Sequence, residues 1–376
     1  MSLTTFLRNA SNLIGWSTKR KFLVIESDDW GAIRMSSNKD YRELNKKGVK
    51  ASSEDEERYL KNDALASNDD LQALFETLYK FKDNTGNHSK FTAVSLPANP
   101  DFERIKKDDF QTYHYKSLPD ILRDYPYHDR SFELWKEGMS SGLFIPQFHG
   151  REHLNVINWM KALQQGEKDT LTAFEHKVYG ITPREPINHI SYQAAFDFMD
   201  PAELEYQKTV LEDGLDLFEK VFGQKASFFV PTNGPFNNIL EESLCTKAIQ
   251  YIGASKVQQM PVGYGKTKKV FHYIGQKNKF GQRYLTRNCF FEPSSNLKSN
   301  WVDSCLSEIE IAFKWNKPAV ISSHRVNYIG WLNPANRDKG LKELSLLLSS
   351  VLNKWPDVEF ISSDQLGEMI AQKNQY

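Results

Sequence analysis

Eight short apolar runs, separated by longer segments with helical spacing, constrain the fold of this 376-residue chain more than any other feature. The runs cover residues 22–25, 91–96, 143–148, 226–230, 251–254, 288–291, 319–322 and 358–361. Between them, segments such as 69–81 and 201–222 repeat apolar residues every three or four positions, which is typical of amphipathic helices. Because strands that alternate with helices pair in parallel, the pattern predicts an α/β fold with a closed or nearly closed barrel.

Two intervals are too long to be ordinary strand-to-helix connections, namely residues 97–141 and 155–200. We expect both to be insertions over the carboxyl face of the barrel, within one elaborated domain that spans residues 1–376. The first insertion is rich in aromatic residues, and at least one of them is expected in a groove, where its ring could stack on a sugar. The alternative is that these rings pack on one another. The residues concerned are Tyr113, Tyr115, Tyr125, Tyr127 and Trp135.

Charge and cysteine content narrow the class of protein. The chain has 48 basic and 48 acidic residues, so no overall field favours nucleic acid. Its three cysteines have no metal-type spacing, which fits a reducing compartment. No apolar stretch has the length of a signal peptide or a membrane span, so we expect a cytoplasmic protein. Residues 1–20 are predicted to form a helix packed on the main domain, with a membrane-surface helix as the alternative.

Ionisable residues follow three of the predicted strands directly. Asp28 and Asp29 come after the first run, His149 and His153 stand four apart after the third, and His324 follows the seventh. The carboxyl ends of parallel barrel strands converge, so these side chains are expected at one site. Two histidines four positions apart at a strand end can supply two ligands to one metal ion.

Four segments around these residues resemble the motifs of a known family. They are ESDDWG, HGREH, FFVPTNGPFN and ISSHR, in this order, within residues 21–325. In combination they resemble the polysaccharide deacetylase family, the NodB-homology or carbohydrate esterase family 4 type. The resemblance implies a distorted (β/α)7 barrel and the removal of N-acetyl groups with the help of a divalent metal.

The family's residue roles carry over to matching positions. Asp28 corresponds to the general base, His324 to the general acid, and Asp29, His149 and His153 to the metal ligands. Zinc is the ion that this ligand set favours, with cobalt and nickel as alternatives.

The chain also departs from the family pattern. Trp30 separates the aspartate pair from Gly31, and Val230 stands where the family has an arginine that pairs with the base. Three arginines next to motifs are candidates to replace it: Arg34, Arg151 and Arg325. Glu292 is the candidate for the carboxylate that orients His324. Trp30, Thr232 and Asn233 are further candidates near the substrate, with a backbone N–H between Thr232 and Gly234 facing the oxyanion.

Three functional hypotheses follow. The first is a metal-dependent deacetylase acting on an N-acetylated amino sugar or polysaccharide. The second is a metal-dependent amidase acting on a non-sugar amide or imide, since one barrel supports many substrates. The third is a catalytically silent glycan-binding protein, which the missing arginine favours and the retained Asp28 disfavours. The expected partner is a carbohydrate or small molecule, and the sequence does not set the oligomeric state.

Overall fold

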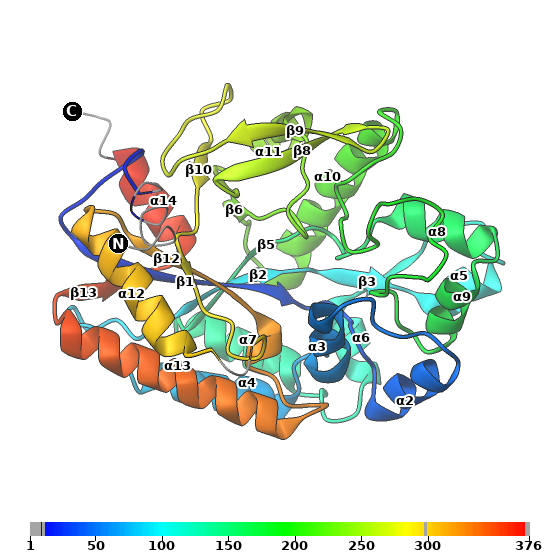
Figure 1. Cartoon of the computed structure of the whole chain (residues 1–376), viewed down its shortest axis with the longest axis horizontal. Helices are drawn as coiled ribbons and strands as arrows, with labels where there is room; N and C mark the ends of the chain where they lie inside the picture. The colour runs from blue at the N-terminus through cyan, green and yellow to red at the C-terminus, as the bar shows by residue number, and fades with distance from the viewer. Residues whose placement is uncertain (1–8, 10–11, 297–298, 373–376) are drawn as a thin grey trace.

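All eight predicted strands are present in the computed structural model, which describes residue 9, residues 12–296 and residues 299–372. They belong to one nine-stranded sheet in which all pairings are parallel (Figure 1). Its strands, in spatial order, are β10 (Arg283–Leu285), β7 (Tyr251–Gly253), β6 (Phe228–Phe229), β5 (Phe144–Phe148), β2 (Phe91–Ser95), β1 (Lys21–Trp30), β12 (Ala319–His324) and β11 (Cys289–Phe290), with β13 (Val358–Phe360) beside the start of β1.

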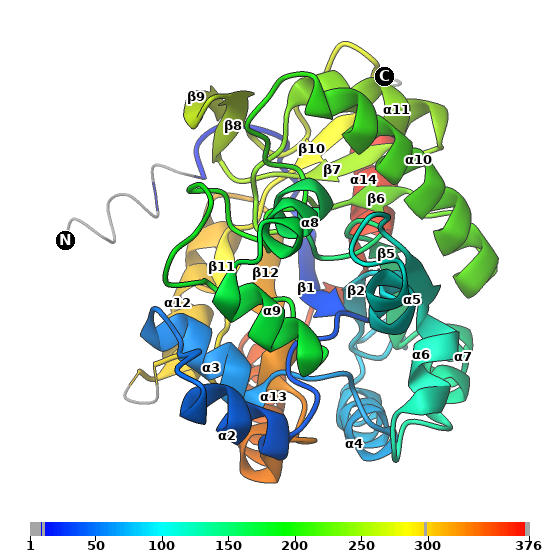
Figure 2. The same ribbon diagram turned by 90° about the vertical axis from the view of Figure 1, so that its right-hand side faces the viewer.

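The sheet curls into a half-barrel, as Figure 2 shows from the side of the carboxyl ends. Within the described residues no pairing joins β10 to β11, so the barrel stays open there, and residues 286–288 carry the chain across the gap. The predicted α/β barrel class is therefore confirmed in an open, distorted form. Strand β10 escaped prediction because its three residues form no apolar run.

Helices cover the outside of this sheet, where α7 packs against α4, α4 against α13, α13 against α12, and α10 against α11. They are α4 (Asn68–Tyr79), α7 (Ser131–Ser140), α10 (Glu203–Phe222), α11 (Glu241–Thr246), α12 (Trp301–Lys314), α13 (Pro334–Lys354) and α14 (Ser363–Gln372). Ser67 and Asp70 form a reciprocal capping box that fixes the start of α4, close to the predicted residue 69. Helix α10 begins two residues after the predicted start and ends at Gly223, whose φ of 73° places it in the left-handed region.

Further elements lie beyond the carboxyl ends of the strands, where β3, α5, α8 and α9 stand at the right of Figure 1. They are α2 (Asn38–Lys46), α3 (Glu54–Asn62), β3 (Ala98–Pro100), α5 (Phe102–Lys107), β4 (Tyr115–Ser117), α6 (Leu118–Asp124), α8 (Val156–Gln164), α9 (Lys168–Glu175), β8 (Val257–Gly263), β9 (Lys266–Phe271) and two 3-10 turns, η1 (Asn238–Leu240) and η2 (Arg325–Asn327). The interval 97–141 also contains α7, which is an ordinary barrel helix against α4 and β5.

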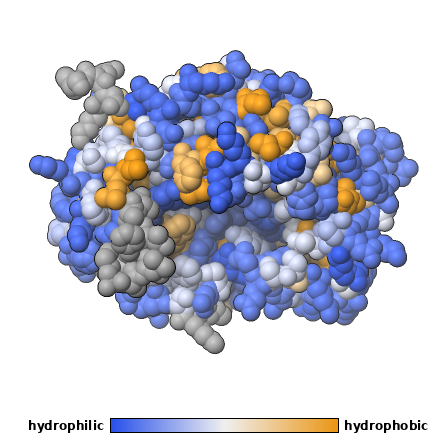
Figure 3. Space-filling view, turned by 45° about the horizontal axis from the view of Figure 1, so that its top comes forward, coloured by the Kyte–Doolittle hydropathy of each residue, from blue (hydrophilic) through white to orange (hydrophobic). Residues whose placement is uncertain are grey.

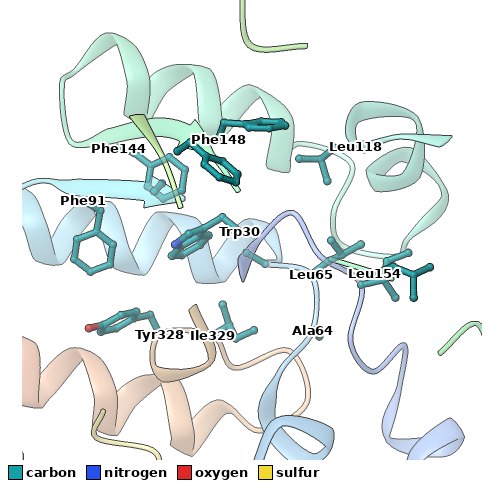
Figure 4. Close-up of a cluster of buried hydrophobic side chains, with 14 of the residues drawn as sticks. Trp30, Ala64, Leu65, Phe91, Leu118, Phe144, Phe148, Leu154, Tyr328 and Ile329 are labelled. Atoms are coloured by element: carbon teal, nitrogen blue, oxygen red, sulfur yellow. The ribbon is translucent and has the colours of Figure 1, made fainter. Parts of the chain in front are cut away.

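The main hydrophobic core lies between the sheet and its helices, and Figure 4 shows its part around Trp30. The Trp30 indole is buried, donates from Nε1 to Ser27 Oγ at 2.9 Å, and meets the Phe144 ring edge-on at a centroid distance of 4.8 Å. Trp30 is therefore a core residue. The expectation that it lies near the substrate is wrong, because its ring packs on Phe144 and Trp135 and is not among the residues that line the cleft.

The predicted N-terminal helix over residues 1–20 falls largely outside the described residues, and between residues 12 and 20 the chain forms turns instead of a helix. Among the described residues, no helix has the length and apolarity needed to cross a bilayer.

Candidate metal centre and active-site cleft

The end of β1 explains how two adjacent aspartates reach the same site. In a regular strand, neighbouring side chains point to opposite faces. Here the pairing of β1 with β2 shifts register between Ser27 and Trp30, and Asp29 has a φ of 74°. Such a bulge re-aims one side chain, so both Asp28 and Asp29 line the same cleft.

Asp29, His149 and His153 form a buried three-residue group with the chemistry of a metal site. Asp29 Oδ1 lies 3.1 Å from His153 Nε2 and 3.5 Å from His149 Nε2. A tetrahedral ion with bonds of about 2.0–2.1 Å needs its ligand atoms roughly 3.3–3.4 Å apart. The three side chains therefore fit a divalent ion of the zinc type.

Each histidine directs Nε2 toward the Asp29 carboxylate. His149 follows β5 directly, and its Nδ1 lies 2.8 Å from the Val230 carbonyl, which can only accept, so Nδ1 carries the proton and Nε2 is left as a donor atom for a metal. Burial lowers the pKa of His153 to about 4, against the opposing effect of Asp29. His153 lies in the bends after β5, so the two histidines sit at a strand end and in the chain just beyond it.

Asp28 is held by an arginine that the sequence analysis did not select. Arg287 donates to both Asp28 oxygens at 2.6 Å and from Nε to Glu26 at 2.5 Å. Burial raises the pKa of Asp28, but the Arg287 guanidinium outweighs it and holds this pKa below the usual value. Arg287 is therefore the cationic partner of Asp28 in this structure.

The three predicted replacements for the family arginine are wrong, because each pairs elsewhere. Arg151 pairs with Glu152 at 2.7 Å and with Asp213 at 2.9 Å, outside the cleft. Arg325 is fully buried and donates to both Asp63 oxygens at 3.0 Å. Arg34 does line the cleft, but it faces Asp29 at 3.5 Å and not Asp28.

His324 lies on the other side of Asp28 and is oriented by Glu292, as predicted. Its Nδ1 is 2.5 Å from Glu292 Oε1, and its Nε2 is 3.8 Å from Asp28 Oδ2. Burial lowers the pKa of His324, but Glu292 and then Asp28 raise it to about 9. Glu292 is itself fixed by Arg58 of α3 at 3.0 Å and by Asn327 at 2.9 Å. The structure therefore presents a protonated imidazole beside the Asp28 carboxylate.

These groups open into one cleft of about 1170 Å³. Figure 3 shows a mostly hydrophilic molecular surface that is hollowed near the centre of the view. The walls come from α3, from residues 180–182 and 191–193 of the second insertion, and from the loops after β6, β7 and β10. Asn233, in the left-handed region with a φ of 57°, and Gly234 line the cleft, as expected, whereas the Thr232 side chain is buried against Ala195.

The aromatic residues of the first insertion do not line the cleft, so that prediction is wrong. Tyr113 meets Trp159 edge-on, Trp135 stacks on Phe222, and the exposed Tyr127 lies against Trp331. These rings therefore pack on other parts of the fold and not, as the alternative expected, on one another. Among the described lining residues, the rings of tyrosine and phenylalanine are those of Tyr59, Phe236 and Phe290.

Sequence comparison finds no protein-family model and no curated protein that matches this chain. Among solved structures, it is similar to Puue allantoinase at 11% identity and a TM-score of 0.49, over 96% of this chain and 94% of that one. It is also similar, at 11% identity and a TM-score of 0.46, to a Mycobacterium smegmatis protein described as a polysaccharide deacetylase. The match covers 96% of this chain and 94% of that one. It is also similar to a polysaccharide deacetylase from Pseudomonas aeruginosa PAO1 at 8% identity and a TM-score of 0.48, over 96% of this chain and 93% of that one. As the motifs predict, polysaccharide deacetylases are among the solved structures similar to this chain. At such low identity, a function has to be argued from the side chains.

Proposed function

We propose that this protein is a metal-dependent hydrolase that removes the acetyl group from an N-acetylated amino sugar, either free or within a polysaccharide. One observation carries the proposal: a three-ligand group, Asp29, His149 and His153, lies beside a carboxylate and a protonated imidazole, Asp28 and His324. Amide hydrolysis needs all three functions, namely a Lewis acid, a base for water and an acid for the leaving amine.

Asp29, His149 and His153 would hold the ion, and zinc is proposed because two neutral imidazoles and one carboxylate suit it, with cobalt or nickel as alternatives. When bound, such an ion polarises the amide carbonyl and lowers the pKa of water. Three protein ligands are the usual number for a catalytic site of this kind, since further positions stay open to substrate.

Asp28 is proposed as the general base. Arg287 keeps its carboxylate ionised in a buried position, and each oxygen still has a second lone pair for a proton. As water adds to the carbonyl carbon, one of its protons passes to Asp28. The backbone N–H of Asn233, on the wall of the cleft, is the candidate to support the oxyanion, because the Gly234 N–H already donates to the Pro231 carbonyl at 3.3 Å.

His324 is proposed as the general acid. With a pKa of about 9 it is protonated at neutral pH, and its Nδ1 is held by Glu292, so Nε2 is the atom that faces the cleft. When the carbon–nitrogen bond breaks, Nε2 gives its proton to the departing amine nitrogen. Glu292 stabilises the imidazolium before this step and orients the ring throughout.

A second candidate, an amidase acting on a non-sugar amide or imide, is favoured by the few tyrosine and phenylalanine rings on the cleft wall, because sugar sites use such rings as stacking platforms. A silent glycan-binding protein is disfavoured, since a site kept only for binding has no need for the buried Arg287–Asp28 pair.

Release of acetate from a panel of N-acetylated sugars and oligosaccharides, measured beside hydrolysis of cyclic amides and imides, separates the three hypotheses. Acetate release that depends on added divalent metal supports the proposal. Turnover of the cyclic substrates alone would move the assignment to the amidase. Glycan binding without turnover of any substrate would support the hypothesis of a catalytically silent glycan-binding protein.

A further inference from the structure

The two oxygens of the Asp29 carboxylate face different partners. Oδ1 lies 3.1 and 3.5 Å from the two imidazole Nε2 atoms of the metal group. Oδ2 lies 3.5 Å from the Arg34 guanidinium, on the other side of the carboxylate. One oxygen is therefore directed at the ligand group and the other at a cation.

The Arg34 guanidinium is fixed on several sides. Its Nη1 donates to the Gln193 side chain, its Cζ stands 5.0 Å from the centre of the Tyr59 ring, and its Nε lies 3.5 Å from Asp63 as an ion pair without a hydrogen bond. A Cβ on Gly180 would come within 3.3 Å of Arg34 Nη1 and 2.7 Å of Gln193 Nε2, so the absence of a side chain there makes room for this pair. A buried arginine with this many partners has little freedom to leave Asp29.

We propose that Arg34 is a positioning residue that keeps Asp29 a one-oxygen metal ligand and lowers the affinity of the site for its ion. This inference rests on the metal-dependent function proposed above. A carboxylate that binds through both oxygens occupies two coordination positions, whereas one that binds through a single oxygen leaves a position open for a reactant. By occupying Oδ2, Arg34 would preserve that open position.

The expected sign of the effect distinguishes this role from a structural one. Removing Arg34 frees Oδ2 to bind and also removes a positive charge close to a divalent cation, and both changes tighten metal binding. Loss of a merely structural residue would loosen the ligands and weaken binding instead, as removal of outer partners of metal ligands usually does. The buried Asp63 keeps its two bonds from Arg325, so Arg34→Ala leaves that carboxylate paired.

The test compares metal-free wild-type protein with Arg34→Ala and Arg34→Lys, titrated with Co²⁺ alone. Arg184→Ala is the matched control, because it also breaks an arginine–aspartate ion pair, here with Asp169. The Arg184 side chain is 64% exposed and lies outside the cleft. The readouts are the dissociation constant for Co²⁺, obtained by competition with a chelator, and the intensity of the visible cobalt absorption, which falls as the coordination number rises. Circular dichroism checks the fold of each variant.

We expect Arg34→Ala to lower the Co²⁺ dissociation constant about tenfold, which corresponds to about 1.4 kcal/mol, and to weaken the visible absorption. Arg34→Lys, which keeps the charge, and Arg184→Ala should stay near the wild type. Unchanged or weaker Co²⁺ binding by Arg34→Ala would overturn the inference while leaving the metal site in place. A wild-type protein that binds no more Co²⁺ than His149→Ala would overturn the proposed function and this inference with it.

Discussion

Replacing Arg287 by methionine tests the central electrostatic feature of the site. Arg287 makes two bonds of 2.6 Å to Asp28 and one of 2.5 Å to Glu26, and both carboxylates are almost completely buried. Removing one partner of a buried ion pair typically costs about 3–5 kcal/mol, because the remaining charge stays uncompensated. We expect the free energy of unfolding at pH 7 to fall by about this amount. Uptake of a proton limits the loss, and Glu26 takes it first, because burial already raises the pKa of Glu26.

The same substitution should change the pH dependence of turnover. In the wild type, Arg287 holds the pKa of Asp28 below its usual value, so this pairing stabilises the fold fully above the unfolded-state pKa of about 3.9 and the stabilisation is lost as the pH falls through the folded value. Without Arg287, burial raises the pKa of Asp28. A base must be ionised to act, so the acidic limb of kcat/KM should move to higher pH.

Three measurements check this prediction: urea unfolding, kcat/KM against pH, and metal content. The double variant Glu26→Gln with Arg287→Met is the control. It removes one of the two unpaired carboxylates, so it should recover part of the stability while its acidic limb stays displaced. If Arg287→Met unfolds within about 1 kcal/mol of the wild type and keeps its acidic limb, the assignment of Arg287 as the partner of the base is wrong.

Three further predictions concern single residues. His153→Ala should lose stoichiometric binding of a divalent ion, measured as metal content after dialysis, because it deletes one of three ligands. Asp28→Asn should keep the metal and lose about 10²- to 10⁴-fold in kcat, whereas Asp29→Ala should lose the metal itself. If Asp29→Ala keeps the metal and Asp28→Asn loses it, the roles assigned to the two aspartates are exchanged. Glu292→Gln should lower the pKa of His324 from about 9 toward its ordinary value of about 6.5, so the alkaline limb of kcat moves to lower pH; an unmoved limb would contradict the acid assignment.

The sequence was sufficient to locate the strands and the residues at their ends. Apolar runs with turn formers marked all eight predicted strands, and parallel pairing brings their carboxyl ends together whatever the details of the helices. That geometric rule is why Asp28, His149 and His324 could be assigned to one site although they are far apart in the chain. Glu292 was chosen instead from the family resemblance, as the candidate for the carboxylate that orients His324, and it does bind His324.

Arginine partners could not be assigned by the same reasoning. Arg34, Arg151 and Arg325 were chosen because they stand next to motifs, yet each reaches a carboxylate other than Asp28. A long side chain spans several residues, so neighbours in sequence say little about which charge it meets. Arg287 lies in the chain that crosses the open side of the barrel from β10 to β11. Recognising β10 as a strand would have made Arg287 a strand-end residue and therefore a candidate.

Val230, directly after β6, packs closely against the end of the neighbouring strand β7. A Cβ placed on Gly253 would lie only 2.7 Å from Val230 Cγ2, which shows how tightly the valine side chain is packed there. The Val230 carbonyl still orients His149, a role that depends on the backbone and is indifferent to the side chain. The Val230 backbone therefore contributes to the metal group, while the cation beside Asp28 comes from the segment between β10 and β11. Because Arg287 enters from the open side of the barrel, it also binds Glu26, so the base and a second buried carboxylate share one cation. Because Glu26 and Asp28 share Arg287, Glu26→Gln removes the competing carboxylate. This variant, alone or with Arg287→Met, is therefore the most direct probe of how strongly Arg287 keeps Asp28 ionised.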